Sequence, residues 1–272
     1  MGRLDAIKFL YAKRLLKTLE KYDVIVVCET VTFSHEVELI ALLRGLGKPL
    51  FMYEVFFLGG CEYWLSRLPS ESLNQFDEYL VVSGIHDSQP MMSEKAHVVG
   101  ADISPICEFS PRRRFTVLMD FPRQGYEDER AVQESALRRL NIDPICLDGE
   151  YTFDQIEKTY RSVDLYFVAF PEAFGVPITQ LQNYGCQIAA PSPRWVKRHA
   201  LIPDGSVYAD KDGHKFNDNF LIYEDEEGLI QGLKRARMAS PLAVKTRFLS
   251  DYPHYASGRL DVLWDVLRSY MV

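Results

Sequence analysis

The stretch from residue 164 to residue 190 constrains the fold of this chain more than any other. Residues 165–170 form an apolar run rich in aromatic and β-branched side chains, which is typical of a strand buried on both faces. A polar loop follows, and then Pro177 and Gly185 mark the start and the end of a helix of about two turns. The next strand is expected after Gly185, at the end of this stretch. This order of strand, helix and strand predicts an α/β fold with parallel strands.

The loop before this helix is a candidate ligand site. A helix that follows a buried strand presents free backbone N–H groups, and the positive end of its dipole, at the carboxyl edge of the sheet. Anionic ligands bind at that edge in open α/β folds. Glu172 lies in the loop just before these N–H groups. Two interpretations are open at this point: an ordinary surface acid beside a helix start, or an acid that faces the phosphate and sugar groups of a ligand.

Composition sets limits on the class of protein. The chain has 272 residues, of which 47% are hydrophobic, and this is enough for one large or two modest domains. The formal net charge of -7 argues against a protein that coats nucleic acid. Because no apolar run has the length of a membrane span and no signal-peptide pattern opens the chain, a cytoplasmic protein is expected. The five cysteines are scattered, mostly in apolar runs, so we expect core residues rather than metal ligands.

Strands and helices alternate in two halves of the chain, separated by a polar stretch that prolines interrupt at residues 85–114. In the first half we expect strands at residues 22–28, 48–57 and 76–84 and a helix at 36–46. In the second half we expect strands at 115–119, 144–147 and 164–170 and a further strand between Gly185 and Ala190, and helices at 127–140, 154–160, 177–184, 225–238 and 242–249. The alternation predicts two parallel-sheet units with helices at the chain ends.

Amphipathic helices are expected at both ends of the chain. Residues 4–20 carry apolar side chains at helical spacing among Lys and Arg, which favours packing on a core and leaves a membrane-surface helix as the alternative. The last helix is expected at residues 259–271, and its apolar face would comprise Leu260, Leu263, Trp264, Leu267 and Met271. That face is expected to cross back onto the first domain or to cover a partner.

The order of these pieces resembles a known family. The strand that begins at Phe115, the segment Leu147-Asp148-Gly149 and the segment Pro171-Glu172-Ala173-Phe174-Gly175-Val176-Pro177 follow one another as in the nucleotide-sugar-binding domain of retaining GT-B glycosyltransferases, in the family-4-like group with a Glu-x7-Glu motif. The first half, with Lys48-Pro49-Leu50, is similar to the later part of that family's acceptor domain. The resemblance covers most of the chain and rests on order and spacing rather than on one motif.

The resemblance implies a GT-B fold of two Rossmann-like parallel-sheet domains, of which the N-terminal one is reduced. Residues 1–105 would form the acceptor-side domain and residues 106–250 the nucleotide-sugar-binding domain. Residues 251–272 would form a C-terminal helix that crosses back and packs on the first domain.

The resemblance also implies a donor site. Glu172 matches the first acid of the motif, which lies close to the donor sugar, and Arg123 would supply a cation for the diphosphate leaving group. Phe174, Gly175 and Val176 match the turn whose backbone amides meet the diphosphate. The other expected substrate-binding residues are Thr179, Gln180 and Gly149.

Three positions depart from the family pattern. Gln180 stands where the second acid of the motif is usual, and its amide oxygen still accepts hydrogen bonds from a ribose. Gln124 replaces an expected lysine, and Asp120 puts an acid near the place of the phosphates. Loss of a positioned cation removes stabilisation of the charge that develops on the leaving group.

Two functions are carried forward from these observations. The first is a metal-independent glycosyltransferase with no cofactor, which transfers a sugar from a nucleotide diphosphate sugar to an unidentified glycan, lipid-linked or protein acceptor. The second is a catalytically silent GT-B-like protein that binds a nucleotide sugar, a glycan or a partner glycosyltransferase. A dinucleotide-binding oxidoreductase is disfavoured because no strand is followed by G-x-G-x-x-G. No nucleic acid partner is expected, whereas peripheral membrane contact and a homo-oligomer stay open.

Overall fold

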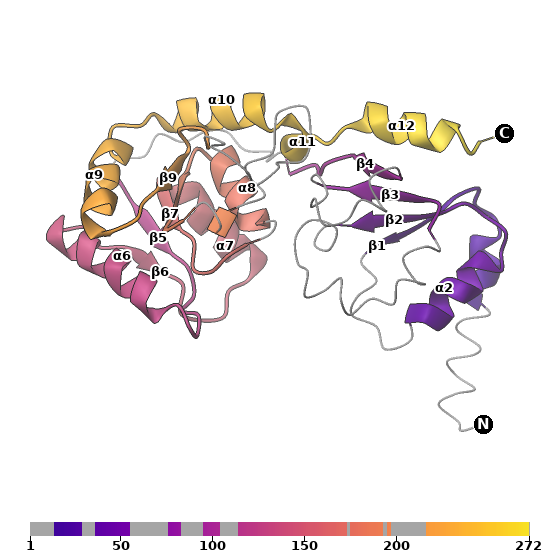
Figure 1. The fold of residues 1–272 in the computed structure, drawn as a ribbon, viewed down its shortest axis with the longest axis horizontal. Coiled ribbons are helices and arrows are strands. Elements are labelled where there is room, and N and C mark those ends of the chain that lie inside the picture. Colours follow the sequence, from indigo (N-terminus) through magenta and orange to yellow (C-terminus); the bar gives the residue numbers. More distant parts are fainter. Residues whose placement is uncertain are drawn as a thin grey trace, which may run out of the picture. The chain divides into compact units, whose positions relative to one another are not determined.

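The computed structural model describes residues 14–28, 36–54, 76–82, 95–103, 114–172, 175–192, 195–196 and 216–271. Contacts divide the chain into two units. Unit 1 comprises Met1–Val99 and Arg259–Val272, and unit 2 comprises Gly100–Gly258. Each unit has its own parallel β-sheet (Figure 1). The domain limits expected after residues 105 and 250 stay a prediction.

Unit 1 is built on a four-stranded sheet in the order β1-β2-β3-β4, in which all neighbours are parallel. The strands are β1 (Ile25–Cys28), β2 (Leu50–Glu54), β3 (Glu78–Val81) and β4 (Ala96–Val98), and helix α2 (Glu36–Arg44) connects β1 to β2. Residues 14–19 are helical, and the rest of the predicted helix at 4–20 lies largely outside the described residues. The sequence analysis missed β4, because three partly exposed residues at a sheet edge are too few to show a pattern.

The last helix, α12 (Leu260–Arg268), packs on this sheet. Its Val266 joins Phe51 and Leu80 in one hydrophobic cluster. Just past the helix, the hydroxyl of Tyr270 donates to Glu78 at 2.7 Å, and its ring meets that of Phe51 with centroids 5.0 Å apart. The expectation that a C-terminal helix crosses back onto the first sheet is confirmed.

The buried face of α12 differs from the predicted one. Leu260, Trp264 and Met271 are 65%, 51% and 56% exposed, so these three residues are not part of the buried face. The packed stripe runs instead through Val262, Val266 and Tyr270 at intervals of four residues, and Leu263 and Leu267 lie along it. The apolar arc of this helix is wider than the face that the sheet covers, and spacing alone does not show which part of the arc is buried.

Unit 2 is built on a five-stranded parallel sheet in the order β6-β5-β7-β8-β9. The strands are β5 (Val117–Met119), β6 (Ile145–Cys146), β7 (Leu165–Phe167), β8 (Gln187–Ala190) and β9 (Phe220–Ile222). The helices are α6 (Glu127–Arg139), α7 (Phe153–Ser162), α8 (Val176–Asn183), α9 (Glu226–Ala236), α10 (Pro241–Asp251) and α11 (Pro253–Ala256). All strands expected between residues 115 and 190 are present. The sequence analysis missed β9 and α11, which have only three and four residues.

The strand order of unit 2 creates a switch point between β5 and β7. The chain runs from β5 to β6 on one side, and then returns to β7 on the other side of β5. The loops that leave the carboxyl ends of β5 and β7 therefore separate in opposite directions. Ligands of open parallel sheets bind in the crevice at such a point.

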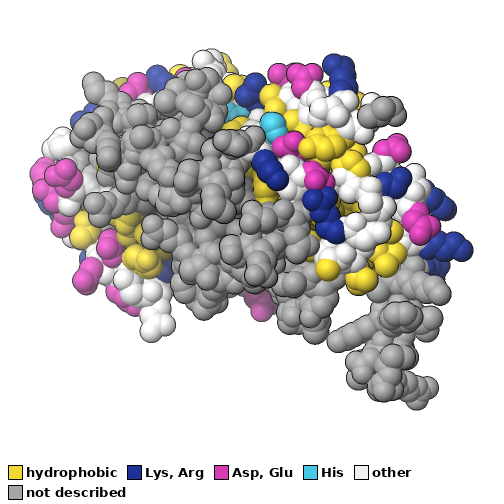
Figure 2. Space-filling view, turned by 45° about the vertical axis from the view of Figure 1, so that its right-hand side comes forward, with side chains coloured by type: hydrophobic (Ala, Val, Ile, Leu, Met, Phe, Trp, Pro, Cys, Tyr) yellow, Lys and Arg dark blue, Asp and Glu magenta, His cyan; other side chains and the backbone are white. Residues whose placement is uncertain are grey.

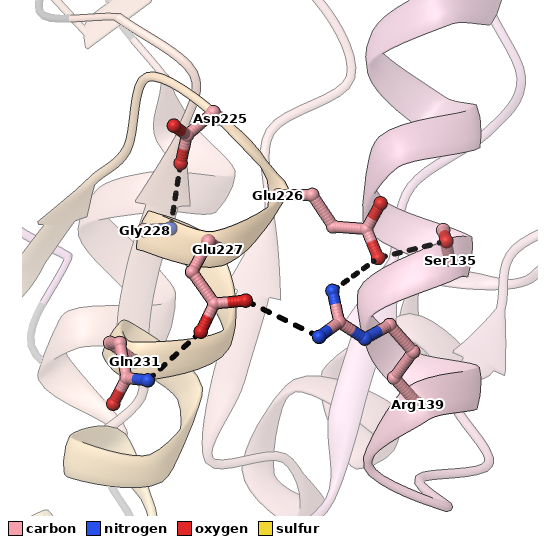
Figure 3. A network of polar contacts seen from close by, with 7 residues as sticks. All are labelled: Ser135, Arg139, Asp225, Glu226, Glu227, Gly228 and Gln231. Carbon is pink, nitrogen blue, oxygen red and sulfur yellow. Dashed lines mark hydrogen bonds and ion pairs between the residues drawn. The ribbon is translucent and has the colours of Figure 1, made fainter.

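Helices α6 and α9 lie side by side on unit 2 and share its core. Below them, Leu137 and Leu233 pack with Val117 of the sheet. On the surface, the Arg139 guanidinium donates to Glu226 at 3.2 Å and to the neighbouring acid of α9 at 3.3 Å (Figure 3). The core contacts and the ion pairs hold the same two helices together.

Side chains at the surface are of mixed charge. On the face that Figure 2 shows, Lys and Arg lie interspersed with Asp and Glu.

Cys186 is buried, but Cys28 and Cys146 are exposed, so the expectation of core cysteines is wrong for these two. Each ends a strand, β1 or β6, that lies at the edge of its sheet in the part of the chain that the structure describes. Among the described residues, no helix is long and apolar enough to cross a membrane.

Candidate functional site

Glu172 lies in the loop between β7 and α8. Its side chain is partly buried, and its backbone N–H donates to the carbonyl oxygen of Trp195 at 2.8 Å. Its carboxyl group lies against Gly175, which is the N-cap residue of α8, because a Cβ atom at Gly175 would overlap Glu172 Oε2. Glycine at this position therefore leaves room for the carboxyl group beside the helix start.

Among the described helices of unit 2, three begin with a side-chain cap, whereas α6, α8 and α11 do not. Side chains cap α7, α9 and α10, namely those of Thr152, Asp225 and Ser240. At α6, the Glu127 carboxylate accepts a hydrogen bond from the Gly125 N–H at 2.9 Å. No described side chain caps α8, and its first turn contains no acid. Pro177, the second residue of α8, has no N–H, but the N–H of Val176 and the positive end of the helix dipole are available to an anionic ligand.

A buried acid lies at the end of the neighbouring strand. Asp120 follows β5 directly and is 9% exposed. Its Oδ2 accepts a hydrogen bond from the hydroxyl of Tyr166 at 2.9 Å, and its carbonyl oxygen accepts one from Arg130 at 2.8 Å. Since Tyr166 belongs to β7, this contact crosses from one side of the switch point to the other.

Glu172 titrates outside the usual range of a carboxyl group. Burial, and then the negative charge of Asp120, raise the pKa of Glu172 from 4.5 to about 7, while Arg123 acts in the opposite direction. Burial and the charges of the same two acids also raise the pKa of the tyrosines Tyr160 and Tyr166. The two acids and the two tyrosines therefore share one electrostatic environment at the carboxyl edge of the sheet.

Arg123 brings a positive charge to the same carboxyl edge of the sheet. Its guanidinium lies 4.6 Å from the centroid of the Phe170 ring, in a cation–π contact between the loops after β5 and β7. Beside it is a small hollow whose walls include the rings of Tyr126 and Trp195, with centroids 5.1 Å apart. Charged and aromatic side chains thus line the crevice at the switch point.

The remaining predicted site residues lie in different surroundings. Val176 is the first residue of α8, and Gln180 is partly buried on the same helix. Thr179 is fully buried, and its hydroxyl donates to the carbonyl oxygen of Val176 at 2.9 Å, so this side chain is engaged within its own helix. Phe174 lies outside the described residues.

Gly149 lies on the separate loop after β6. It is exposed, and a Cβ atom added there would meet nothing within 4 Å. Tyr151 links this loop to the loop after β5, because its ring lies 5.9 Å from that of Phe121. The structure thus brings Glu172, Arg123 and Gly175 together and places Gly149 apart from them.

Sequence reasoning missed Tyr166, Tyr126 and Trp195. One signal was present for Tyr166, because the hydroxyl of a buried tyrosine normally needs a hydrogen-bond partner. Asp120 was noticed only as a departure from the family pattern. Among the described residues, no group of three or more His, Cys, Asp or Glu side chains is arranged to hold a metal ion.

Comparison with known proteins shows the fold. No protein-family model matches this chain, and no curated protein matches it. A solved structure described as trehalose-6-phosphate from E. coli bound with UDP-2-fluoro glucose is 11% identical, covers 98% of this chain and 77% of its own chain, and has a TM-score of 0.57. The catalytic domain of starch synthase IV from Arabidopsis thaliana, bound to ADP and acarbose, is 12% identical and has a TM-score of 0.54. The match covers 96% of this chain and 75% of the starch synthase chain. The chain has an α/β fold of two Rossmann-like parallel-sheet domains, of the GT-B type.

Proposed function

We propose that this chain is a glycosyltransferase that transfers a sugar from a nucleotide diphosphate sugar to an acceptor. The observation that carries the proposal is the position of Glu172 beside the uncapped start of α8, at the switch point of the sheet. A helix start supplies N–H donors for a diphosphate, and an acid beside it is within reach of the attached sugar. The GT-B fold gives the second line of support.

Each residue of this site has a role in the proposed reaction. The bond between the sugar and the diphosphate breaks, and the backbone amides at Gly175 and Val176, together with Arg123, stabilise the negative charge of the leaving group. Glu172 holds the sugar, and Gln180 accepts hydrogen bonds from the ribose. The acceptor hydroxyl oxygen forms the new bond to the sugar, and its proton passes to a phosphate oxygen of the leaving nucleotide diphosphate. Retention of configuration enters the proposal through the family resemblance alone.

Uridine and adenosine nucleotides are the donors to test first. The E. coli structure contains UDP-2-fluoro glucose, and the starch synthase contains ADP. We extend these nucleotide classes to the present chain as candidate donors. An acceptor of the glycan, lipid-linked or protein class, peripheral membrane contact and a homo-oligomer stay predictions.

Asp120 favours a second candidate function, a catalytically silent GT-B-like protein that binds a nucleotide sugar, a glycan or a partner glycosyltransferase. This acid is buried at the end of β5, where the resemblance implies cations for the diphosphate. Gln124 stands where the resemblance implies a lysine. Removal of one positioned donor or cation costs about 3 kcal/mol of transition-state stabilisation, which is enough to reduce turnover about a hundredfold.

Nucleotide titration followed by a hydrolysis assay separates the two functions. Calorimetry with UDP and ADP is expected to show binding, and UDP-glucose or ADP-glucose is expected to be hydrolysed slowly without an acceptor. Glu172→Ala should abolish the hydrolysis while the circular dichroism spectrum shows that the variant is still folded. The control Glu150→Ala, at an exposed acid after β6, should change neither. Binding without hydrolysis supports the silent protein, and absence of nucleotide binding refutes the glycosyltransferase.

A further inference from the structure

The loop that carries Glu172 lies beside the chain segment that leaves the neighbouring strand β8. Just past β7, the N–H of Val168 donates to the carbonyl oxygen of Ala189 at 3.1 Å. Farther along the loop, the N–H of Glu172 donates to the carbonyl oxygen of Trp195 at 2.8 Å. The position of the Glu172 backbone therefore depends on the position of Trp195.

Trp195 is in turn held against the loop after β5. Its side chain is 8% exposed, and its ring meets the ring of Tyr126 edge to face, with centroids 5.1 Å apart and an angle of 76° between the planes. Aromatic pairs favour this geometry, so the contact fixes the Trp195 ring relative to Tyr126. The N–H of Trp195 donates to the carbonyl oxygen of Ser192 at 3.1 Å, which closes a turn after β8.

Tyr126 is anchored at the start of α6, where it is the N-cap residue. Its N–H donates to the carbonyl oxygen of Arg123 at 3.3 Å, and its own carbonyl oxygen accepts a hydrogen bond from the N–H of Arg130 at 3.2 Å. Farther along the helix, Ala136 and Leu137 pack in the core of unit 2. The ring of Tyr126 is thus connected to the core through a regular helix.

These contacts form a contact path that runs from Tyr126 through Trp195 to the backbone of Glu172. It ends where Oε2 of Glu172 lies against Gly175 at the start of α8. Groups that bind or react need such support, because a displacement of about 1 Å can lower a rate about a hundredfold. The two aromatic rings therefore have a use beyond filling space beside the site.

We propose that Tyr126 and Trp195 are positioning residues of the donor site, which hold the carboxyl group of Glu172 beside the start of α8. Their effect on sugar binding rests on the proposed function, whereas the contact path does not. The groups proposed for the diphosphate, which are the start of α8 and Arg123, do not depend on the ring contact. Loss of this contact should weaken binding of the sugar and leave binding of the nucleotide unchanged.

The first test measures the hold on Glu172 without any ligand. In protein labelled with isotopic glutamate, NMR follows exchange of the Glu172 amide hydrogen, whose resonance is assigned by its loss in Glu172→Gln. Exchange should be at least about tenfold faster in Tyr126→Leu, which removes the ring, and unchanged in Tyr126→Phe, which keeps it. The control Phe115→Leu also replaces a ring by leucine, at a partly buried residue before β5, and should leave the exchange unchanged. An unchanged rate in Tyr126→Leu, or the same acceleration in Phe115→Leu, overturns the proposal.

The second test compares UDP with UDP-glucose by calorimetry. Tyr126→Leu should raise the Kd for UDP-glucose about tenfold, the effect of losing one strong hydrogen bond, and leave the Kd for UDP unchanged. Tyr126→Phe should match the wild type for both ligands. In the background of Glu172→Ala, Tyr126→Leu should have no further effect on UDP-glucose, because the contact path then ends without a carboxyl group.

The outcomes of the second test separate the positioning role from the proposed function. An unchanged Kd for UDP-glucose in Tyr126→Leu, an equal effect on UDP, or a full effect in the background of Glu172→Ala overturns the positioning role. If neither ligand binds the wild type, the proposed function falls, and the amide exchange alone decides whether Tyr126 and Trp195 position Glu172.

Discussion

Glu172→Gln should stabilise unit 2 at neutral pH and leave its stability unchanged in acid. The pKa of Glu172 is raised from 4.5 to about 7 in the folded chain. Below pH 4.5 both the folded and the unfolded chain bind the proton, so the raised pKa does not change the free energy of unfolding there. Above that value the unfolded chain releases the proton first, and the free energy of unfolding falls until the folded chain titrates near pH 7. Because each tenfold difference in acidity corresponds to about 1.4 kcal/mol, the total loss is about 3 kcal/mol.

The glutamine variant cannot titrate and therefore avoids this loss. Native-state hydrogen exchange in the peptides that contain β5 and β7 measures the unfolding free energy of unit 2 by itself. The difference between Glu172→Gln and the wild type should grow from zero to about 3 kcal/mol between about pH 4 and pH 8. The control Glu127→Gln should act in the opposite direction, because hydrogen bonds from the backbone lower the pKa of Glu127. If the difference in unfolding free energy between Glu172→Gln and the wild type is constant across this pH range, the pKa of Glu172 is not raised in the folded chain.

Three further substitutions test the site and the packing. Gly175→Ala puts a methyl group where the carboxyl group of Glu172 lies, so the Kd for UDP-glucose should rise at least about tenfold at a cost of about 1–3 kcal/mol in stability; an unchanged Kd in calorimetry would contradict this position of the acid. Arg123→Lys keeps the positive charge but loses the planar stacking on the Phe170 ring, so this variant should bind UDP-glucose more weakly than the wild type and more tightly than Arg123→Ala. Equal affinities of the wild type and Arg123→Lys would exclude a role for stacking. Gly232→Ala drives a methyl group into a buried side chain of β9 and should cost about 1–3 kcal/mol in thermal or urea unfolding, whereas Gly149→Ala, in open space, should leave stability unchanged; similar stabilities for the two variants would contradict the close packing of α9.

The alternation of strands and helices was predictable where the strands are buried on both faces. The strand residues of β5, β7 and β8 are apolar and buried except for Gln187, as is typical of parallel strands covered on both faces. The edge strand β4 and the short strand β9 have three residues each, and a period cannot be recognised over that length. The face of α12 was predicted only in part, because its exposed Trp264 lies on the same apolar arc as its buried residues.

The chemistry at the helix start was predictable from local rules, whereas the coupling to Asp120 was not. Free N–H groups, a glycine at the N-cap and an acid in the preceding loop are all visible within a few residues of Glu172. The hydrogen bond between Asp120 and Tyr166 depends on the register of β5 against β7, and an apolar run contains no information about that register. A shift by one residue would turn the Tyr166 side chain to the opposite face of the sheet and separate the pair. The effect of Asp120, the acid that departs from the family pattern, therefore depends on the fold, which brings its charge near Glu172, the acid that matches the pattern.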